Sequence, residues 1–209
     1  GQPSDRAEFK LVTRGELMPT HPAATRATFR DIFASRGIEL VEGNGVKTVS
    51  KGTVELSSGR KIPADGCSWC TQAAPQPWLA ESGLDVDNGF VKVSPTLQST
   101  NASGVFAAGD CASVVGHPRP KAGVFAVRQG PPLHDNLRRY LLGEALVDFT
   151  PQKTFLGLIS TGSKHAIASW GSLSLGGATR TGAMLWNWKD KIDKKWMKMY
   201  QEMPEMTAP

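Results

Sequence analysis

A Gly-Asp pair directly after a short apolar run is the part of the sequence best suited to chemistry. Residues 105–112 read VFAAGDCA, so Gly109 and Asp110 follow a run that predicts a buried strand. In open α/β sheets, ligands bind at the carboxyl ends of the strands. Gly109 lets the backbone approach a ligand closely, and Asp110 offers a carboxylate as a hydrogen-bond acceptor. The alternative is that Asp110 is an ordinary turn residue or a helix N-cap, which is common in α/β proteins.

Two flanking segments extend the pattern around this pair. Residues 96–101 read TLQSTN, and residues 120–130 read PKAGVFAVRQG. The whole block resembles the second flavin-binding motif of the FAD-dependent pyridine nucleotide–disulfide oxidoreductases. Within that superfamily it is most similar to the type II NADH dehydrogenase-like group, which includes reductase modules joined to selenide, water dikinase. The resemblance covers nearly the whole chain and implies FAD and NAD(P)H as cofactors of the complete protein.

The activity that the resemblance implies is electron transfer. A hydride passes from a reduced pyridine nucleotide to FAD, and the electrons then pass to a quinone or another acceptor. The cofactor supplies the redox chemistry, and the protein supplies position and electrostatics. In this family the carboxylate at the position of Asp110 accepts hydrogen bonds from the ribityl chain of FAD. The alternative is a non-catalytic structural or interaction subunit derived from such a reductase.

The opening of a long predicted helix is the second candidate element. Its first residues are Ala122, Gly123 and Val124, and a helix N-terminus carries a partial positive charge of about half a unit. That charge favours electron density on a reduced flavin, and Lys121 can add to it. Gln129 occupies a position where related quinone-reducing enzymes carry polar groups. The alternatives are an ordinary exposed lysine and a glutamine that faces solvent.

Arg14 follows the first predicted strand. In members of the family that use NADH, an acidic residue at the end of this strand receives the ribose hydroxyls. An arginine there suits a 2′-phosphate, because guanidinium–phosphate hydrogen bonds are charge-assisted. The resemblance therefore implies that Arg14 contributes to cofactor binding with a preference for NADPH. The default alternative is a solvated surface arginine.

The pair Cys67 and Cys70 has C-x-x-C spacing, which is typical of redox pairs and of half zinc sites. No second such pair and no suitably spaced histidine accompanies it. We expect residues 65–71 to form a buried strand, in which two residues three apart point to opposite faces. The sequence therefore favours structural burial for this pair, and for Cys111 as well.

The elements that position these residues alternate between strand and helix. We expect strands at 8–13 and 38–42 around a helix at 22–35, which predicts a parallel β-α-β unit. A small meander at 46–63 and a short helix at 78–82 follow, then strands at 89–93 and 105–108. A long helix at 124–142 is expected to bury one stripe, formed by Val124, Val127, Leu133, Leu137 and Leu141. Three antiparallel strands at 155–175 and a last helix at 183–199 complete the order.

The fold class is therefore α/β, with a partial Rossmann-like parallel sheet of the FAD/NAD(P)-binding type and a small α+β C-terminal interface domain. The resemblance divides the chain into three parts. Residues 1–84 resemble the C-terminal half of an NAD(P)-binding domain. Residues 85–150 resemble the returning segment of an FAD-binding domain, and residues 151–209 resemble a C-terminal interface or membrane-associating domain.

The glycine-rich loops that bind pyrophosphate are not in this sequence. No G-x-G-x-x-G follows a predicted strand, whereas the family uses two such turns. We therefore expect an N-terminal flavin-binding half as a partner of this chain, and we expect the chain alone to be colourless and inactive. Gln72 stands where relatives usually have glycine, which puts a side chain close to the dinucleotide path. A homodimer or a larger assembly is the further partner expectation.

Composition excludes several classes of protein. The 209 residues include 24 basic and 19 acidic ones, and this net charge of +5 is too small to indicate a nucleic-acid partner. Three cysteines argue against a disulfide framework, and no apolar run is long enough to span a membrane. We expect a cytoplasmic or organellar location.

The last helix carries a separate signal. Its apolar stripe recurs at intervals of three and four residues and comprises Leu185, Trp188, Ile192, Trp196 and Met199. Lysines occupy the other faces, at positions 189, 191, 194, 195 and 198. Tryptophans beside lysines suit the headgroup region of an anionic membrane, so peripheral membrane contact is one interpretation. The other interpretation is packing on the preceding sheet or on a second subunit.

Overall fold

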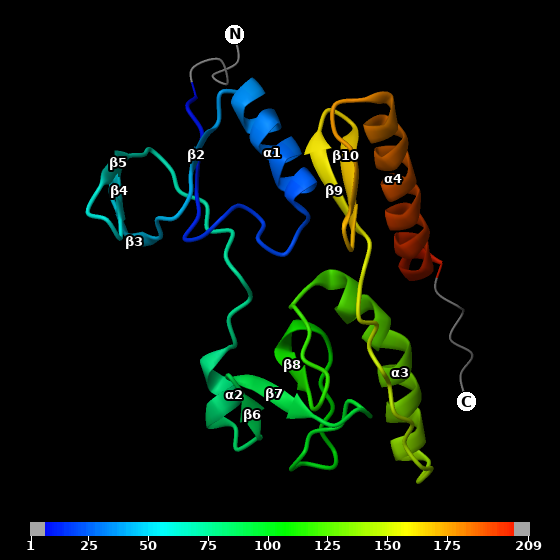
Figure 1. The fold of residues 1–209 in the computed structure, drawn as a ribbon. Helices are drawn as coiled ribbons and strands as arrows, with labels where there is room; N and C mark the ends of the chain where they lie inside the picture. Colours follow the sequence, from blue (N-terminus) through cyan, green and yellow to red (C-terminus); the bar gives the residue numbers. More distant parts are fainter. Residues whose placement is uncertain (1–6, 203–209) are drawn as a thin grey trace. The chain divides into compact units, whose positions relative to one another are not determined.

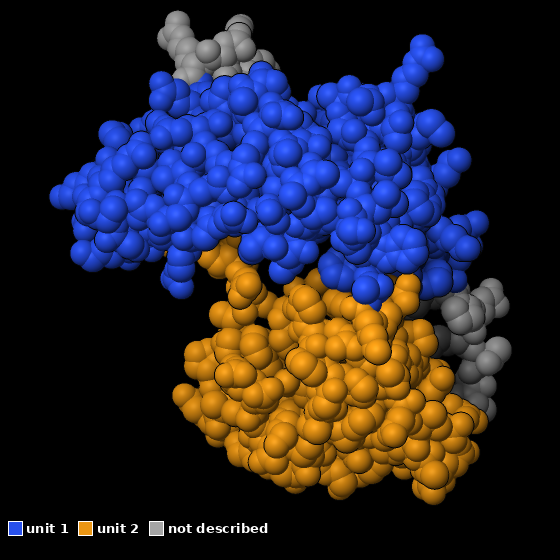
Figure 2. Space-filling view, in the orientation of Figure 1, with its two compact units in different colours: residues 1–68, 154–209 blue, residues 69–153 orange. Residues whose placement is uncertain are grey.

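The computed structural model describes residues 7–202, and the chain divides into two compact units (Figure 2). Unit 1 contains residues 1–68 and 154–209, and unit 2 contains residues 69–153. The predicted functional division at residues 84 and 150 stays a prediction. The described residues form four small sheets of two or three strands each. The fold is therefore mixed α/β, as predicted at the level of class. Among the described residues, however, the strands form several small sheets and not one continuous parallel sheet.

Unit 1 begins with the predicted parallel β-α-β unit. Strand β1 (Lys10–Val12) pairs in parallel with β2 (Glu39–Val41), and helix α1 (Ala23–Ser35) connects them. Phe29 and Ile32 on one face of α1 are buried. Gly37 has φ +65°, a conformation that ends the helix at no steric cost for glycine. This β-α-β prediction is confirmed.

An antiparallel meander follows β2 in unit 1. It consists of β3 (Val46–Ser50), β4 (Thr53–Leu56) and β5 (Lys61–Pro63), in that order across the sheet. Val54, Leu56 and Ile62 are buried together with Val41 of β2, which ties the meander to the β-α-β unit.

The C-terminal part of unit 1 is an antiparallel sheet that α4 covers (Figure 1). The strands are β9 (Gly157–Gly162), β10 (His165–Trp170) and β11 (Leu173–Gly176), and the helix α4 spans Arg180–Gln201. Thr179 caps α4 by accepting a hydrogen bond from the Gly182 amide at 3.2 Å. A Cβ on Gly182 would lie 1.8 Å from the Gly177 carbonyl oxygen, so only glycine fits there.

The apolar stripe of α4 is only partly covered. Leu185 and Trp196 are half-buried, whereas Trp188, Ile192 and Met199 are exposed. Three lysines of the helix pair with acidic residues four positions away. Within the described chain, no helix combines the length and the apolar character that crossing a bilayer requires.

Unit 2 contains helix α2 (Pro77–Glu81), a three-stranded sheet and helix α3 (Gly123–Leu141). In the sheet, β6 (Val86–Asp87) is antiparallel to β7 (Phe90–Val93), and β7 is parallel to β8 (Ala112–Val114). The core of this unit includes Val91, Val93, Leu97 and Val114.

Two predicted strands are wrong. Residues 65–71 form no strand and are exposed, so Cys67 and Cys70 are not buried as predicted, and Cys111 is exposed as well. Residues 105–108 contribute only an isolated bridge between Phe106 and Gln98. The sheet strand is instead β8, which begins two residues after Asp110. The reason is that the amide of Ala107 donates to the Leu97 carbonyl, which draws this segment to a neighbouring loop rather than into the sheet.

The buried face predicted for α3 is only partly right, because Leu133 is partly buried against the core of unit 2 and Val124 is half-buried, whereas the other three predicted residues are not. Val127 and Leu137 are exposed, and Leu141 is 81% exposed. The buried residues are Phe125, Gln129 and Asn136. Two of these are polar, and each has backbone groups as hydrogen-bond partners, which makes their burial favourable.

Candidate functional site

A cavity of about 210 Å³ in unit 2 is bordered by the predicted Gly-Asp turn. Its walls come from the β6–β7 turn, from the turn that begins at Gly109 together with β8, and from residues 117–121. The first two turns of α3 form the remaining wall through Phe125, Ala126 and Gln129. The site is therefore assembled where β7, β8 and α3 meet.

Gly109 begins a short 3₁₀ turn, Gly109–Cys111, with φ +72°. A side chain at this φ is strained, and a Cβ there would lie 3.3 Å from the Cβ of Ala126 on α3. The amide of Gly109 donates a hydrogen bond of 2.5 Å to Oε1 of Gln129, whose residue is 6% exposed. The turn is thus fastened to α3 by close packing and by a buried side chain.

Asp110 lies on the cavity wall and is exposed. Its carboxylate is therefore available to accept hydrogen bonds from a ligand. A carboxylate that binds a ligand must lie outside the packed core. Asp110 meets this requirement, because it is exposed at the cavity.

Lys121 lies on the same wall. Its Nζ donates to the Ala112 carbonyl oxygen and sits 4.1 Å from the centroid of the Phe90 ring. Burial lowers the pKa of Lys121, and the nearby Asp110, Cys111 and Asp87 partly oppose that shift. The ammonium is held by a carbonyl and an aromatic face, a cation–π arrangement, rather than by a salt bridge.

Helix α3 begins without a side-chain cap. Ala122 is the N-cap residue, and it makes no side-chain capping hydrogen bond. Gly123 and Val124 lie in that turn but not on the cavity wall, which the next residues form. The positive end of the helix dipole therefore lies beside the cavity, where it favours negative charge or electron density.

Two further side chains hold other parts of the cavity wall. Asp87 accepts hydrogen bonds from Ser113 Oγ at 2.7 Å and Asn88 Nδ2 at 3.1 Å. Arg119 donates through Nε to the Gln152 carbonyl at 2.9 Å and through Nη2 to the Pro151 carbonyl at 3.1 Å. Pro151 itself lines the cavity, so the returning chain is part of the site.

The chain leading to Pro151 is held by Asn136, which is 1% exposed. Its Nδ2 donates to the carbonyls of Thr96 and Val147, each at 2.8 Å, and its Oδ1 accepts from the Val147 amide at 2.9 Å. The side chain therefore uses both ends of its amide to bind segments far apart in sequence.

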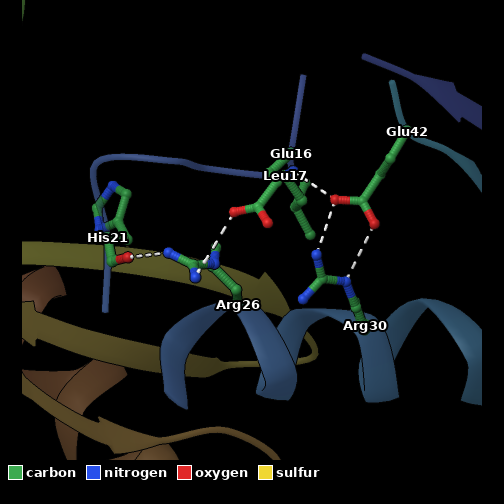
Figure 3. A network of polar contacts seen from close by, with 6 residues as sticks. All are labelled: Glu16, Leu17, His21, Arg26, Arg30 and Glu42. Carbon is green, nitrogen blue, oxygen red and sulfur yellow. Dashed lines mark hydrogen bonds and ion pairs between the residues drawn. The ribbon is translucent and has the colours of Figure 1, made fainter. Parts of the chain in front are cut away.

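Arg14 belongs to unit 1 and is exposed. The loop that follows it is fastened by Glu42, which accepts from the Leu17 amide at 2.5 Å and from Arg30 at 2.8 Å and 3.1 Å (Figure 3). The hydrogen bond from Arg30, followed by that from Leu17, lowers the pKa of Glu42. In the same network, Arg26 donates to the His21 carbonyl and pairs with Glu16.

The structure brings together Gly109, Asp110, Lys121 and Gln129 around one cavity. Gln129 does not face solvent, and its carbonyl oxygen is used by the backbone of Gly109. Sequence reasoning missed Phe90, Asp87 and Arg119. No local pattern identifies them, because each acts through a partner distant in sequence.

The arrangement suits a ligand with hydroxyl groups and an electron-accepting ring. An exposed carboxylate accepts from hydroxyls, a glycine turn permits close approach, and a helix N-terminus with a lysine favours added electron density. A Cβ on Gly109 would crowd Ala126 of α3, so the turn that bears Asp110 packs directly on the helix at the cavity wall.

Comparison with known proteins gives matches to oxidoreductases and to one chain of a large assembly, and each match covers only part of the other protein. A probable NADH dehydrogenase of Dictyostelium discoideum is 34% identical over 83 residues, which are 39% of this chain and 18% of that protein. The sulfide:quinone oxidoreductase of Aquifex aeolicus shares the fold with a TM-score of 0.69 at 14% identity, over 91% of this chain and 49% of that one.

A third similar chain occurs in the mitochondrial ATP synthase structure of Tetrahymena thermophila. It has a TM-score of 0.59 at 20% identity and covers 94% of this chain and 51% of its own length. The present chain thus spans about half or less of each of these proteins. Residues 8–130 match the family model described as pyridine nucleotide-disulphide oxidoreductase, and the chain belongs to that family.

Proposed function

We propose that this chain is part of a flavin-dependent oxidoreductase that passes electrons from NAD(P)H through FAD to a quinone or another acceptor. The observation that carries the proposal is the Gly109–Asp110 turn, fastened to α3 by Gln129 and open to the cavity. Membership of the family supports the use of FAD and NAD(P)H. When bound, FAD supplies the hydride and electron chemistry.

The residues of this chain have distinct roles in that proposal. Asp110 accepts hydrogen bonds from the hydroxyls of the ribityl chain, and Gly109 allows the close approach. Lys121 and the N-terminal turn of α3, from Ala122 to Val124, stabilise electron density on the reduced ring. Gln129 positions Gly109 through its buried hydrogen bond rather than touching the ligand.

Arg14 carries the finer proposal of NADPH preference. Its side chain is exposed on a loop that Glu42 fastens, and a guanidinium binds a 2′-phosphate through charge-assisted hydrogen bonds. Replacing Arg14 by Glu should favour NADH over NADPH in a nucleotide-dependent assay. Equal use of both nucleotides before and after the change contradicts the preference.

The test of the main proposal uses protein isolated from its natural source through a tag on this chain. We expect a bound flavin spectrum and NAD(P)H-dependent reduction of a soluble quinone or ferricyanide. Asp110→Asn should lower flavin content. Asp148→Asn is the matched control, because Asp148 is also exposed and does not line the cavity. Flavin retained equally in both variants contradicts the role of Asp110.

The second candidate function is a structural subunit of a large assembly. The fold of this chain also occurs in the mitochondrial ATP synthase structure from Tetrahymena thermophila. Gln72, exposed on the loop before α2, further departs from the glycine usual in relatives. Native mass measurement separates the two proposals. A heavy complex without flavin supports the structural subunit, and a yellow, small assembly with reductase activity supports the enzyme.

A further inference from the structure

The Lys121 side chain is held at the cavity by two groups from neighbouring strands. Its Nζ donates a hydrogen bond to the Ala112 carbonyl oxygen and lies 4.1 Å from the centroid of the Phe90 ring. Phe90, Ala112 and Lys121 all line the cavity, and all belong to unit 2. The proposed function uses the charge of Lys121 but gives no role to Phe90.

Strand register explains why the ring and the carbonyl meet at one ammonium group. In the parallel pair of β7 and β8, Val91 stands opposite Ala112. Val91 is buried in the core of unit 2, and successive side chains along a strand point to opposite faces. The neighbouring Phe90 is therefore turned away from the core, where it borders the cavity. The side chain of β7 and the backbone of β8 together hold the Lys121 ammonium.

The backbone on either side of Lys121 is fixed as well. Arg119, two residues earlier, donates hydrogen bonds to the carbonyls of Pro151 and Gln152. Ala122, the next residue, is the N-cap of α3. The long side chain of Lys121 is thus the part that still needs orienting, and the Phe90 ring and the Ala112 carbonyl orient it.

The charge of Lys121 depends on groups that favour the ammonium form. Burial lowers the pKa of Lys121, and the charges of Asp110, Cys111 and Asp87 only partly oppose that shift. In the proposed function a ligand occupies the hydrogen bonds of Asp110 and displaces water from the cavity. Cation–π attraction becomes stronger when the ammonium loses water. The ring face of Phe90 therefore continues to favour the charged lysine when the cavity is filled.

We propose that Phe90 is a positioning residue, whose ring face keeps the Lys121 ammonium charged and in place at the ligand cavity. The inference rests on the proposed function, in which this charge stabilises electron density on the reduced flavin. An apolar side chain without a ring at position 90 fills similar space but does not attract a cation. Such a change should favour the neutral amine and make the flavin harder to reduce.

The first test measures the reactivity of the Lys121 amine, because acetic anhydride acetylates only the neutral form. Protein isolated from its natural source through a tag on this chain is labelled at one fixed pH near neutrality. Acetylation of Lys121 blocks tryptic cleavage there and yields peptide 93–128, in which Lys121 is the only lysine. Labelling is compared with that of the exposed Lys51 in unit 1.

Removal of the ring should raise the labelling of Lys121. Phe90→Leu and Phe90→Met should each increase it about two- to fivefold, which is the cation–π attraction of a partly exposed ammonium expressed as an equilibrium ratio. Phe90→Tyr keeps the ring and should behave as wild type. Phe106→Leu is the matched control, because Phe106 is also half-buried in unit 2 but does not line the cavity. It should leave the labelling unchanged.

The second test measures the midpoint potential of the flavin in the same preparations. It should become more negative in Phe90→Leu and Phe90→Met and should keep the wild-type value in Phe90→Tyr. Equal labelling of Lys121 in wild type and in the Leu and Met variants overturns the inference. Changed labelling with an unchanged potential also overturns it, because Phe90 then holds Lys121 without acting on the flavin. Preparations that carry no flavin contradict the proposed function instead, and the labelling still tests the contact between Phe90 and Lys121.

Discussion

Replacing Gly109 by Ala tests whether α3 fixes the turn that bears Asp110. Alanine at φ +72° costs about 1–2 kcal/mol, because L-residues disfavour the left-handed region. The new Cβ would also lie 3.3 Å from the Ala126 Cβ. Because this contact is only slightly too short, we expect it to lower the unfolding free energy by about 1 kcal/mol, the lower end of the range for overpacked cores. The expected total loss of unfolding free energy is about 2–3 kcal/mol.

Gly143→Ala is the matched control for the backbone contribution. Gly143 has φ +70°, lies just after α3, and has open space where a Cβ would be. This change should cost only about 1–2 kcal/mol and leave flavin affinity unchanged. Urea unfolding followed by circular dichroism measures both losses. The flavin content of protein isolated from its natural source through a tag on this chain measures binding, which should fall only in Gly109→Ala.

A double-mutant cycle isolates the contact between the turn and α3. Ala126→Gly alone should cost about 1 kcal/mol, because glycine is unfavourable within a helix. Combined with Gly109→Ala, it should recover the crowding cost, which gives a coupling energy of about 1 kcal/mol. Equal losses for Gly109→Ala and Gly143→Ala, with no coupling to Ala126, would refute the reasoning.

Four further predictions concern other parts of the chain. Because hydrogen bonds from Arg30 and Leu17 lower the pKa of Glu42, its stabilisation is complete above the ordinary value of 4.5 and is lost as pH falls through the lowered pKa. Glu42→Gln should therefore lower urea midpoints near neutral pH, and the gap to wild type should close in acid. Gln129→Leu should cost about 1–3 kcal/mol in urea unfolding by leaving the Gly109 amide unpaired, whereas an unchanged midpoint would show that this hydrogen bond contributes little. The chain purified alone should show no flavin absorbance after dialysis, and a stoichiometric flavin spectrum would contradict this. If α4 contacts membranes, the chain should float with anionic but not neutral vesicles, Trp188→Ala should reduce flotation, and absence of flotation with anionic vesicles would remove that interpretation.

Patterns that depend on neighbours in sequence predicted the fold well. The β-α-β unit, the meander and the C-terminal sheet with its helix all agree with the structure. In each case the spacing of apolar residues and glycine turns reflects local geometry directly. Phe29 and Ile32, for example, are one turn apart and are both buried.

Patterns that depend on distant partners misled the prediction. Hydropathy favours burial of Leu141 and exposure of Asn136, and the structure has the reverse. Asn136 is buried because the carbonyls of Thr96 and Val147 bind it, and no local pattern in the sequence reveals those partners. The predicted strand at 105–108 failed for a similar reason, since the Ala107 amide bonds to the Leu97 carbonyl in a neighbouring loop.

For the candidate site, the sequence predicted some of the residues that line the cavity and missed others. Gly109, Asp110 and Lys121 are close in sequence to a recognisable pattern, and they do border one cavity. The contact of Lys121 with the Phe90 ring arises only from the packing of β7 against the following segments. The roles of these residues in cofactor binding stay predictions.

The buried amide of Asn136 gives the cavity a remote support. Its side chain bonds Val147, and the chain continues from Val147 to Pro151, whose carbonyl oxygen accepts a hydrogen bond from Arg119. Loosening the far end of α3 should therefore widen the ligand-binding space without any change to a residue that touches ligand. Substitutions at Asn136 should therefore change the affinity for a ligand in the cavity without altering the wall that bears Asp110.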